Sequence, residues 1–280
     1  MCMLHVVKEL HHGAVHVLTV DHGLRESAAA ETRLVARLAS GLGLACHVER
    51  LGLEDGPDLQ ERAREGRLTA AADLADRLGC TRIATGHTAT DQAETVLFRI
   101  ARGTARTGAL GMSPRRGRMI RPLLGVTRRQ TRSWCAEHGI EVVDDPSNQD
   151  PRFTRSRVRH RLLPALNDIH DGADRNVAAF AERLRDEDAL ITEWVDEAWA
   201  RCVGAGGLKA EAFRAESDPV KRLLVRRLIA DAGLGGGARE SRHLDRVLDL
   251  IDRPARIQLP GGTASVERGE LIVRQSEDAS

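Results

Sequence analysis

The first hundred residues alternate between short apolar runs and longer amphipathic stretches. The runs with the length of buried strands lie at 14–20, 45–51 and 82–85. The helical patterns beside them cover 1–10, 27–42 and 59–78. Strands that alternate with helices predict βαβ units and a parallel sheet. We therefore expect an α/β fold built on a doubly wound parallel sheet, Rossmann-like in type.

The pattern changes after residue 170. Charged amphipathic helices are expected at 175–202, 219–232 and 239–251, and short strands with glycine turns at 256–259, 263–267 and 270–274. A chain of 280 residues is long enough for two cores. We expect a catalytic domain over 1–170 and a smaller, mainly helical domain over 171–280 that ends in a β meander and contacts the substrate.

Composition excludes several classes of protein. No apolar run is long enough to cross a membrane, and no signal-peptide pattern opens the chain. The five cysteines are scattered and form no Cys-x-x-Cys pair, which argues against a zinc ribbon, a redox pair or a disulfide framework. The cytoplasm is the expected compartment.

One stretch combines strand, turn and helix signals, from Gly86 to Gly103. His87 follows the third strand, and Asp91 lies in the first turn of a helix whose apolar face is Ala93, Val96, Leu97 and Ile100. Ligands of open α/β sheets bind beyond the carboxyl ends of strands. This places His87 and Asp91 where a site is expected, although Thr88 and Asp91 also match a plain capping box.

A run without acidic residues follows. Between Thr95 and Ala136 there is no Asp, Glu or Lys. The ten arginines of this run are Arg99, Arg102, Arg106, Arg115, Arg116, Arg118, Arg121, Arg128, Arg129 and Arg132. Such a run predicts a surface for phosphates, and the alternative is a set of solvated faces in an arginine-rich chain. Aromatic residues are 2% of the chain and tyrosine is absent, so base stacking is not expected to be the main mode of RNA binding.

Two further polar clusters accompany these. Asp21-His22-Gly23 follows the first strand, and the turn at 144–150 leads into a helix with Arg155 and Arg159 on one face. The alternative for the first cluster is an ordinary polar turn, and the alternative for the second is an amphipathic surface helix.

Together these pieces resemble the tRNA(Ile)-lysidine synthetase family of the PP-loop ATP pyrophosphatase superfamily. The matching segments, in the family's order, are VDHGLR at 20–25, AREGR at 63–67, GHTATDQAETVLFRIARGT at 86–104, RPLL at 121–124, and DPSN at 145–148 followed by FTRSRVRHRLLP. The resemblance covers most of residues 14–166 and is looser beyond 170.

The resemblance implies a ligase that uses ATP and Mg²⁺. ATP would activate C2 of the wobble cytidine of tRNA(Ile) with a CAU anticodon as an adenylate, and L-lysine would then displace AMP. A homodimer is one assembly that such a chain can form. Residue by residue, the resemblance implies His87, Asp91 and Arg67 as catalytic, with Asp91 also as a metal ligand. It implies Asp21, His22, Gly86, Arg155 and Arg159 for nucleotide binding, and Arg115, Arg116, Arg118 and Arg121 for tRNA.

The chain departs from the family at one motif. The nucleotide signature Ser-Gly-Gly-x-Asp-Ser is not in this sequence, and residues 1–7 resemble the helix that follows it. The expectation is a chain that starts too late, with weak ATP binding and little activity. The alternatives are a non-catalytic tRNA-binding remnant, a related tRNA thiolase, and a generic adenylate-forming enzyme, against which the arginine run argues.

Overall fold

The computed structural model describes residues 1–21, 26–53, 56, 59–104, 106–142, 154–234, 240–253 and 255–276. The expectations for His22 and for the turn at 144–150 lie outside these ranges. The chain divides into two compact units. The first unit is 1–99 with 108–181, and the second unit is 100–107 with 182–280. The division falls within one long helix, whereas the domain boundary near residue 170 stays a prediction.

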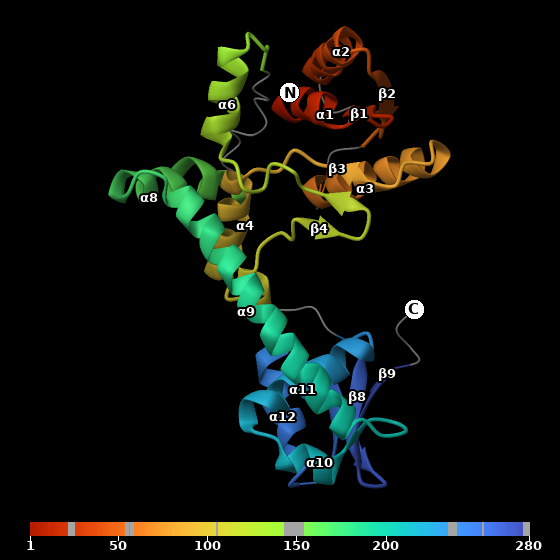
Figure 1. Ribbon diagram of the computed structural model, residues 1–280. Coiled ribbons are helices and arrows are strands. Elements are labelled where there is room, and N and C mark those ends of the chain that lie inside the picture. The colour runs from red at the N-terminus through yellow and green to blue at the C-terminus, as the bar shows by residue number, and fades with distance from the viewer. Residues whose placement is uncertain are drawn as a thin grey trace. The chain divides into compact units, whose positions relative to one another are not determined.

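The first unit alternates strands and helices over its N-terminal part, as predicted (Figure 1). Its elements up to the candidate site are α1 (Cys2–Leu10), β1 (His16–Asp21), α2 (Glu26–Gly41), β2 (Ala45–Arg50), α3 (Leu59–Arg77), β3 (Ile83–Ala84) and α4 (Ala89–Ala101). They are followed by β4 (Arg115–Arg116), β5 (Met119–Ile120), α6 (Arg128–Glu137), α7 (Thr154–Arg157), the π-helix η2 (Val158–Leu162) and α8 (Leu163–Ile169). The short α5 (Arg106–Ala109) spans the two units.

The strands of the first unit pair in two sheets. β1 and β2 are parallel, with His16 opposite Ala45 and Asp21 opposite Arg50. β5 lies between β3, to which it is parallel, and β4, to which it is antiparallel. The parallel β1–α2–β2 unit confirms the predicted α/β class. No pairing joins the two sheets among the described residues, so the expected single sheet is seen here as two separate ladders.

Two small hydrophobic clusters hold the first unit. One joins Val17 of β1 to Ala39 of α2 and to Leu44. The other joins Ala93 of α4 to Val158 of η2 and Leu163 of α8. Ala93 and Val96 are fully buried as predicted, but Ile100 is 51% exposed. The predicted apolar face is therefore wrong in its last turn, because the cluster covers the middle of α4 rather than its end.

The segment at 113–120 forms a hairpin. β4 pairs with β5 around Gly117, whose φ is +58°. β5 then pairs with β3. Strands of two residues are too short to show a period of two, so the pattern could not reveal them.

The second unit combines helices with one antiparallel sheet. Its elements are the C-terminal part of α9 (Ala173–Cys202), β6 (Leu208–Lys209), α10 (Ala210–Ala215), α11 (Asp218–Asp231), α12 (Glu240–Asp249), β7 (Arg256–Leu259), β8 (Gly262–Glu267) and β9 (Glu270–Gln275). The strand order is β6-β9-β8-β7. The predicted meander is confirmed and gains β6 at its edge.

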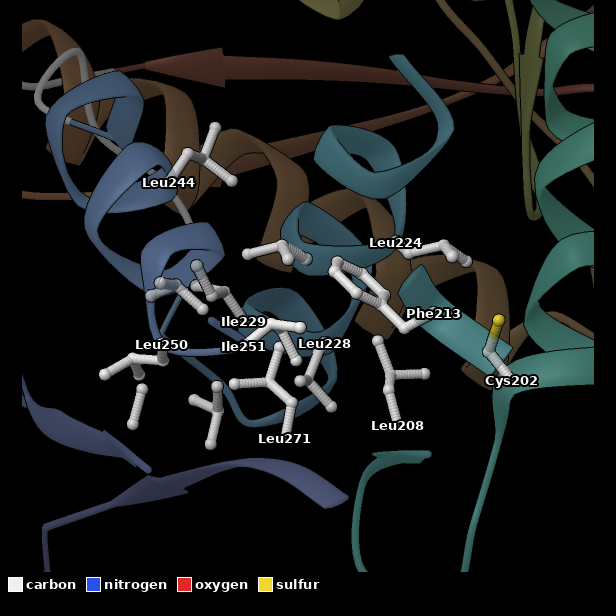
Figure 2. Close-up of a cluster of buried hydrophobic side chains, with 14 of the residues drawn as sticks. Cys202, Leu208, Phe213, Leu224, Leu228, Ile229, Leu244, Leu250, Ile251 and Leu271 are labelled. Atoms are coloured by element: carbon white, nitrogen blue, oxygen red, sulfur yellow. The ribbon is translucent and has the colours of Figure 1, made fainter. Parts of the chain in front are cut away.

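A larger core stabilises the second unit. Figure 2 shows the side chains of Phe213, Leu208 and Leu271 among those of the surrounding helices, and all three are at most 1% exposed. Leu224 and Leu228 of α11 belong to the same cluster. Burial of this apolar surface is the main stabilising contribution to such a unit. Among the described helices of both units, none is long and apolar enough to cross a membrane.

Candidate active site

The site begins where β3 passes into α4. β3 ends at Ala84, and the turn that follows carries His87, whose Nδ1 lies 2.8 Å from Thr85 Oγ1. The Oγ1 and the backbone N–H of Thr88 both donate to Asp91 Oδ2, at 2.7 and 2.9 Å, and Asp91 N–H lies 3.3 Å from Thr88 Oγ1. The capping box considered as the bland alternative is therefore present.

The cap uses only one oxygen of Asp91. Its other oxygen, Oδ1, accepts hydrogen bonds from Arg128 Nη2 at 2.7 Å and from Arg159 Nη2 at 3.3 Å. Asp91 is 9% exposed. One carboxylate thus starts the helix and also faces two guanidinium groups, so capping and a charged site are not exclusive here.

Glu94 is the second acid of the site, one turn further along α4, and it is fully buried. Arg159 binds it with two bonds, Nε to Oε1 at 2.6 Å and Nη2 to Oε2 at 2.9 Å. Arg155 Nε donates to Oε2 at 3.2 Å, and Arg128 Nη1 lies 3.5 Å from Oε1. A buried carboxylate is tolerated only when it is paired and hydrogen-bonded in this way.

Three arginines therefore surround two acids, which leaves this cluster (Asp91, Glu94, Arg128, Arg155, Arg159) with a net positive charge. Arg128 is the first residue of α6, Arg155 lies in α7, and Arg159 lies in the π-helix η2. A π-helical turn is rare and is frequently found at functional sites. The cluster is thus assembled from segments about 35 and 65 positions away from α4 in sequence.

The arginines determine the charge of Asp91. Burial by itself would raise the pKa of Asp91, but Arg128 and the two bonds from Thr88 outweigh it and hold the pKa below its ordinary value. Asp91 is therefore an anion at neutral pH.

A second group of cations lies around His87. Burial lowers the pKa of His87, and although Asp91 raises it, the charges of Arg121, Arg155 and Arg64 lower it further. His87 is accordingly neutral at neutral pH. The pKa of Arg67 is lowered by burial of its guanidinium and by Arg64 and Arg155. Positive charges gathered in this way favour the binding of a polyanion.

The arginines of α3 fit this role because they are uncommitted. Arg64 and Arg67 are exposed residues, although the guanidinium group of Arg67 is partly buried, and neither has an ion-pair partner within the part of the chain that the structure describes. The resemblance implies Arg67 as catalytic, and the structure brings it into the electrostatic environment of Arg155. Its role stays a prediction.

Two other predicted residues have neighbours outside this cluster. Asp21 ends β1, and its Oδ2 is 4.0 Å from Arg50 Nε of β2. Gly86 is exposed and faces α1, where a Cβ on it would lie 4.0 Å from Met3 Sδ. The roles of Asp21, His22 and Gly86 in nucleotide binding stay predictions.

The arginine run is less unpaired than its sequence suggests. Arg106 pairs with Asp188, Arg118 with Asp76, Arg128 with Asp91, and Arg129 with Asp171. Four of the ten arginines in the run therefore already have acidic partners. The acids that pair with them lie elsewhere in sequence, so a window along the chain could not show them.

The four arginines predicted to contact tRNA differ in their surroundings. Arg115 and Arg116 are exposed on β4. Arg118 donates to the carbonyl of Cys80 as well as pairing with Asp76. Arg121 donates to Ser113 O at 2.5 Å and to Met119 Sδ at 3.1 Å. Contacts of all four with tRNA stay predictions, and Arg115 and Arg116 are the most accessible of them.

The acids do not form a metal site as they are arranged. No group of three or more His, Cys, Asp or Glu side chains suited to a metal occurs among the described residues. Both oxygens of Asp91 already accept hydrogen bonds, so a magnesium ion would have to displace Arg128 or Arg159 from Oδ1. Asp91 as a metal ligand stays a prediction.

Sequence reasoning missed Glu94 and Arg128 as site residues. Glu94 lies three positions after Asp91, and this spacing on a helix places both on one face, which could have revealed it. Arg128 carried no such signal, because it was one of ten arginines in a run.

The chain matches two family models. The PP-loop domain model matches residues 1–166, and the TilS substrate binding domain model matches residues 208–272. These matches confirm the predicted fold class for the first part of the chain.

Relatives match over most of its length. The tRNA(Ile)-lysidine synthase of Thermobifida fusca is 36% identical over 267 residues, which cover 91% of this chain and 81% of the relative. That of Streptomyces coelicolor is 36% identical over 270 residues, covering 92% and 76%.

The structural similarity is more distant. The U34-tRNA thiolase NcsA from Methanococcus maripaludis matches with a TM-score of 0.54 at 14% identity, over 65% of this chain and 66% of the thiolase. That likeness concerns the fold alone. The two family models and the relatives, joined to the ordered motifs and the charged cluster on α4, show that this chain belongs to the tRNA(Ile)-lysidine synthase family.

Proposed function

We propose that this chain ligates L-lysine to C2 of the wobble cytidine of tRNA(Ile) with a CAU anticodon, using ATP. The single observation that carries the proposal is the pair of acids Asp91 and Glu94, ringed by Arg128, Arg155 and Arg159 beside the cations of α3. A reaction between a polyphosphate and an amino acid needs both kinds of group in one place. Family membership favours this substrate set over others.

In the first step the C2 carbonyl oxygen of cytidine attacks the α-phosphorus of ATP. The bond from that phosphorus to the bridging oxygen breaks, and pyrophosphate leaves with the electron pair. Negative charge grows on the phosphate oxygens, and fixed cations stabilise such charge. Arg64, Arg67 and Arg155 are the guanidinium groups that we assign to it. Magnesium would be held by the ATP phosphates and would supply positive charge there.

In the second step the ε-amine of lysine attacks C2 and AMP leaves with the electrons of the C2–O bond. The amine must be neutral when it attacks and must lose a proton afterwards. His87 is neutral at neutral pH because burial lowers its pKa, so it can accept that proton. Asp91, held as an anion by Arg128, can orient the lysine ammonium before reaction.

The second candidate is a tRNA-binding protein without catalysis. One observation favours it, namely that Arg115 and Arg116 are exposed on β4. It predicts tRNA binding without ATP-dependent release of pyrophosphate. The thiolase alternative has less support, because the relatives that match over most of the chain are lysidine synthases and the thiolase likeness concerns the fold alone.

The test is incorporation of radiolabelled lysine into a tRNA(Ile) transcript with a CAU anticodon by the 280-residue chain. We expect label in the tRNA only when ATP is present, with one pyrophosphate released per lysine. A transcript with uridine at the wobble position is the control and should take no label. Saturable tRNA binding without label or pyrophosphate would replace this proposal by the second candidate.

Variants connect the activity to the site. Asp91→Asn and Arg67→Ala should each lower the rate of incorporation at least about 100-fold, the range for loss of a group that acts on the transition state. Arg33→Ala, on the exposed surface of α2, is the matched control and should leave the rate unchanged. Equal rates in Asp91→Asn and Arg33→Ala would remove Asp91 from the mechanism. A homodimer stays a prediction and can be measured on the same samples by sedimentation.

A further inference from the structure

The first unit contains a cavity that the proposed reaction does not use. It has a volume of about 340 Å³ and lies between α1, α6 and Leu42, which directly follows α2. None of its lining residues belongs to the Asp91–Glu94 cluster. Its volume falls within the range of about 300–1,000 Å³ found for small-molecule sites.

Aromatic rings form one wall of this cavity. The rings of Trp134 and His138, one turn apart on α6, are stacked with centroids 4.3 Å apart and an angle of 26° between planes. His5 of α1 meets Trp134 edge to face, with centroids 6.3 Å apart. Leu42 and Ile140 add apolar surface. A wall of this kind suits the flat face of a heteroaromatic ligand.

Two imidazole nitrogens are available for hydrogen bonds. His5 Nε2 is buried and has no hydrogen-bond partner within the part of the chain that the structure describes. His138 Nδ1 lies 2.8 Å from the carbonyl oxygen of Trp134 and must donate to it, which leaves Nε2 of the neutral ring as an acceptor. A buried nitrogen without a partner is unfavourable, and a ligand N–H or O–H would relieve this.

The charges at the cavity are mixed. Lys8 and Glu9, consecutive residues of α1, both line it and both are exposed. An ammonium group can bind a phosphate, and a carboxylate can accept a bond from an exocyclic amine. Aromatic faces, one buried ring nitrogen without a partner, one cation and one acid together describe the groups that recognise a nucleotide.

We propose that this cavity binds a nucleobase, stacked on the Trp134–His138 pair and hydrogen-bonded by His5, with its phosphate toward Lys8. The same chemistry is offered by a free mononucleotide and by an unpaired base of an RNA strand. This site is additional to the proposed lysine-transfer site and does not depend on the reaction. It also explains how a chain with few aromatic residues can hold one base specifically while arginines bind the phosphates.

The experiment is a calorimetric titration of the intact chain with guanosine 5′-monophosphate, which is neither ATP nor the cytidine substrate. Ribose 5-phosphate, which lacks a base, is the ligand control. A tRNA(Ile) transcript is titrated in parallel by fluorescence anisotropy. Trp134→Leu removes the stacking surface and keeps apolar bulk. Trp194→Leu, at a 66% exposed tryptophan on α9, is the matched control in the nucleotide titration.

We expect the mononucleotide to bind and ribose 5-phosphate not to bind. Trp134→Leu should weaken binding at least about five-fold, the lower range for stacking of one base on an aromatic ring, and Trp194→Leu should leave it unchanged. If Trp134→Leu weakens only the binding of tRNA, the site holds a base within RNA. If it weakens only the binding of the mononucleotide, the site holds a free nucleotide.

His138→Ala is a second variant that tests the site if Trp134→Leu misfolds. His138 is exposed at the end of α6, so its loss leaves the core intact. We expect this variant to weaken binding about two-fold or more. Unchanged affinity for both ligands in His138→Ala and in a folded Trp134→Leu overturns the proposal. So does equal binding of ribose 5-phosphate and guanosine 5′-monophosphate. Either result leaves the lysine-transfer proposal untouched.

Discussion

Arg128 donates to Asp91 Oδ1 at 2.7 Å although the two residues are 37 positions apart in sequence. The backbone N–H of Arg128 also donates to Thr90 Oγ1 at 3.0 Å. The first residue of α6 is thus fixed to the first turn of α4 by its main chain and its side chain together. Thr90 Oγ1 in turn donates to Asp174 Oδ2 at 2.7 Å, which adds the start of α9 to the same network.

Removal of Arg128 should therefore destabilise the protein more than removal of its neighbour. Arg128→Ala leaves the nearly buried Asp91 and the fully buried Glu94 with fewer compensating charges. We expect a loss of about 1–3 kcal/mol in the free energy of unfolding, measured by urea denaturation. Arg129→Ala breaks only an exposed pair with Asp171 and should cost about 0.5 kcal/mol or less. Equal costs would show that the Arg128 contacts add no stability.

Acid should remove the stabilisation that Asp91 provides. The folded-state pKa of Asp91 is lowered, with burial opposing the shift and Arg128 and Thr88 producing it. Its stabilising effect is therefore fully present above the unfolded pKa of about 3.9 and is lost as pH falls through the lower folded pKa. The difference in unfolding free energy between the wild type and Asp91→Asn should be largest near pH 7 and shrink below about pH 4. A difference that stays constant from pH 7 to pH 3 would contradict the lowered pKa.

The basic hairpin should contact RNA through its exposed residues. Replacing Arg115 and Arg116 together by alanine should weaken tRNA binding and reduce the slope of log K against log salt by about one to two, because each phosphate contact contributes about 0.7–0.9. Arg118→Ala is the comparison, since Arg118 is committed to Asp76 and to the carbonyl of Cys80. We expect its salt slope to match the wild type. A slope reduced by about one in Arg118→Ala would assign that arginine to the RNA after all.

Gly111 and Gly117 both have a left-handed backbone conformation, but only Gly111 is also crowded by a neighbouring side chain. Gly111 has a φ of +68°, and a Cβ on it would lie 2.6 Å from Gln92 Oε1. Gln92 is almost fully buried, and its amide is held by Met112 N–H at 2.6 Å and by Met112 O at 3.0 Å, so it cannot move away freely. Gly117 has a φ of +58° and open space around the same position.

Gly111→Ala should therefore cost more stability than Gly117→Ala. Both substitutions force alanine into the left-handed region, at a cost of about 1–2 kcal/mol. Only Gly111→Ala also displaces Gln92, which should add about 1–3 kcal/mol by overpacking and by disturbing its hydrogen bonds. Thermal or urea denaturation of the two variants measures the difference. Equal destabilisation would mean that Gln92 rearranges without cost.

Local patterns were sufficient for most of the fold. Helix α3 was predicted at 59–78 and found at Leu59–Arg77, and the β7–β8–β9 meander was predicted from its glycine turns. These features depend on periodicity and turn chemistry within one segment. The strands β4 and β5 were missed because two residues carry no period, and they form only because β5 pairs with β3.

The α/β class, the order of the motifs that place the chain in its family, and the position of Asp91 at the start of a helix could all be predicted from the residues in order. Which charges meet depends on how the chain folds. The tertiary structure took four arginines out of the unpaired set by bringing acids from distant segments, and it surrounded Glu94 with Arg128, Arg155 and Arg159. The physical reason is that a buried charge is governed by its neighbours in space, whereas periodicity along a chain reports only which face of each element is apolar.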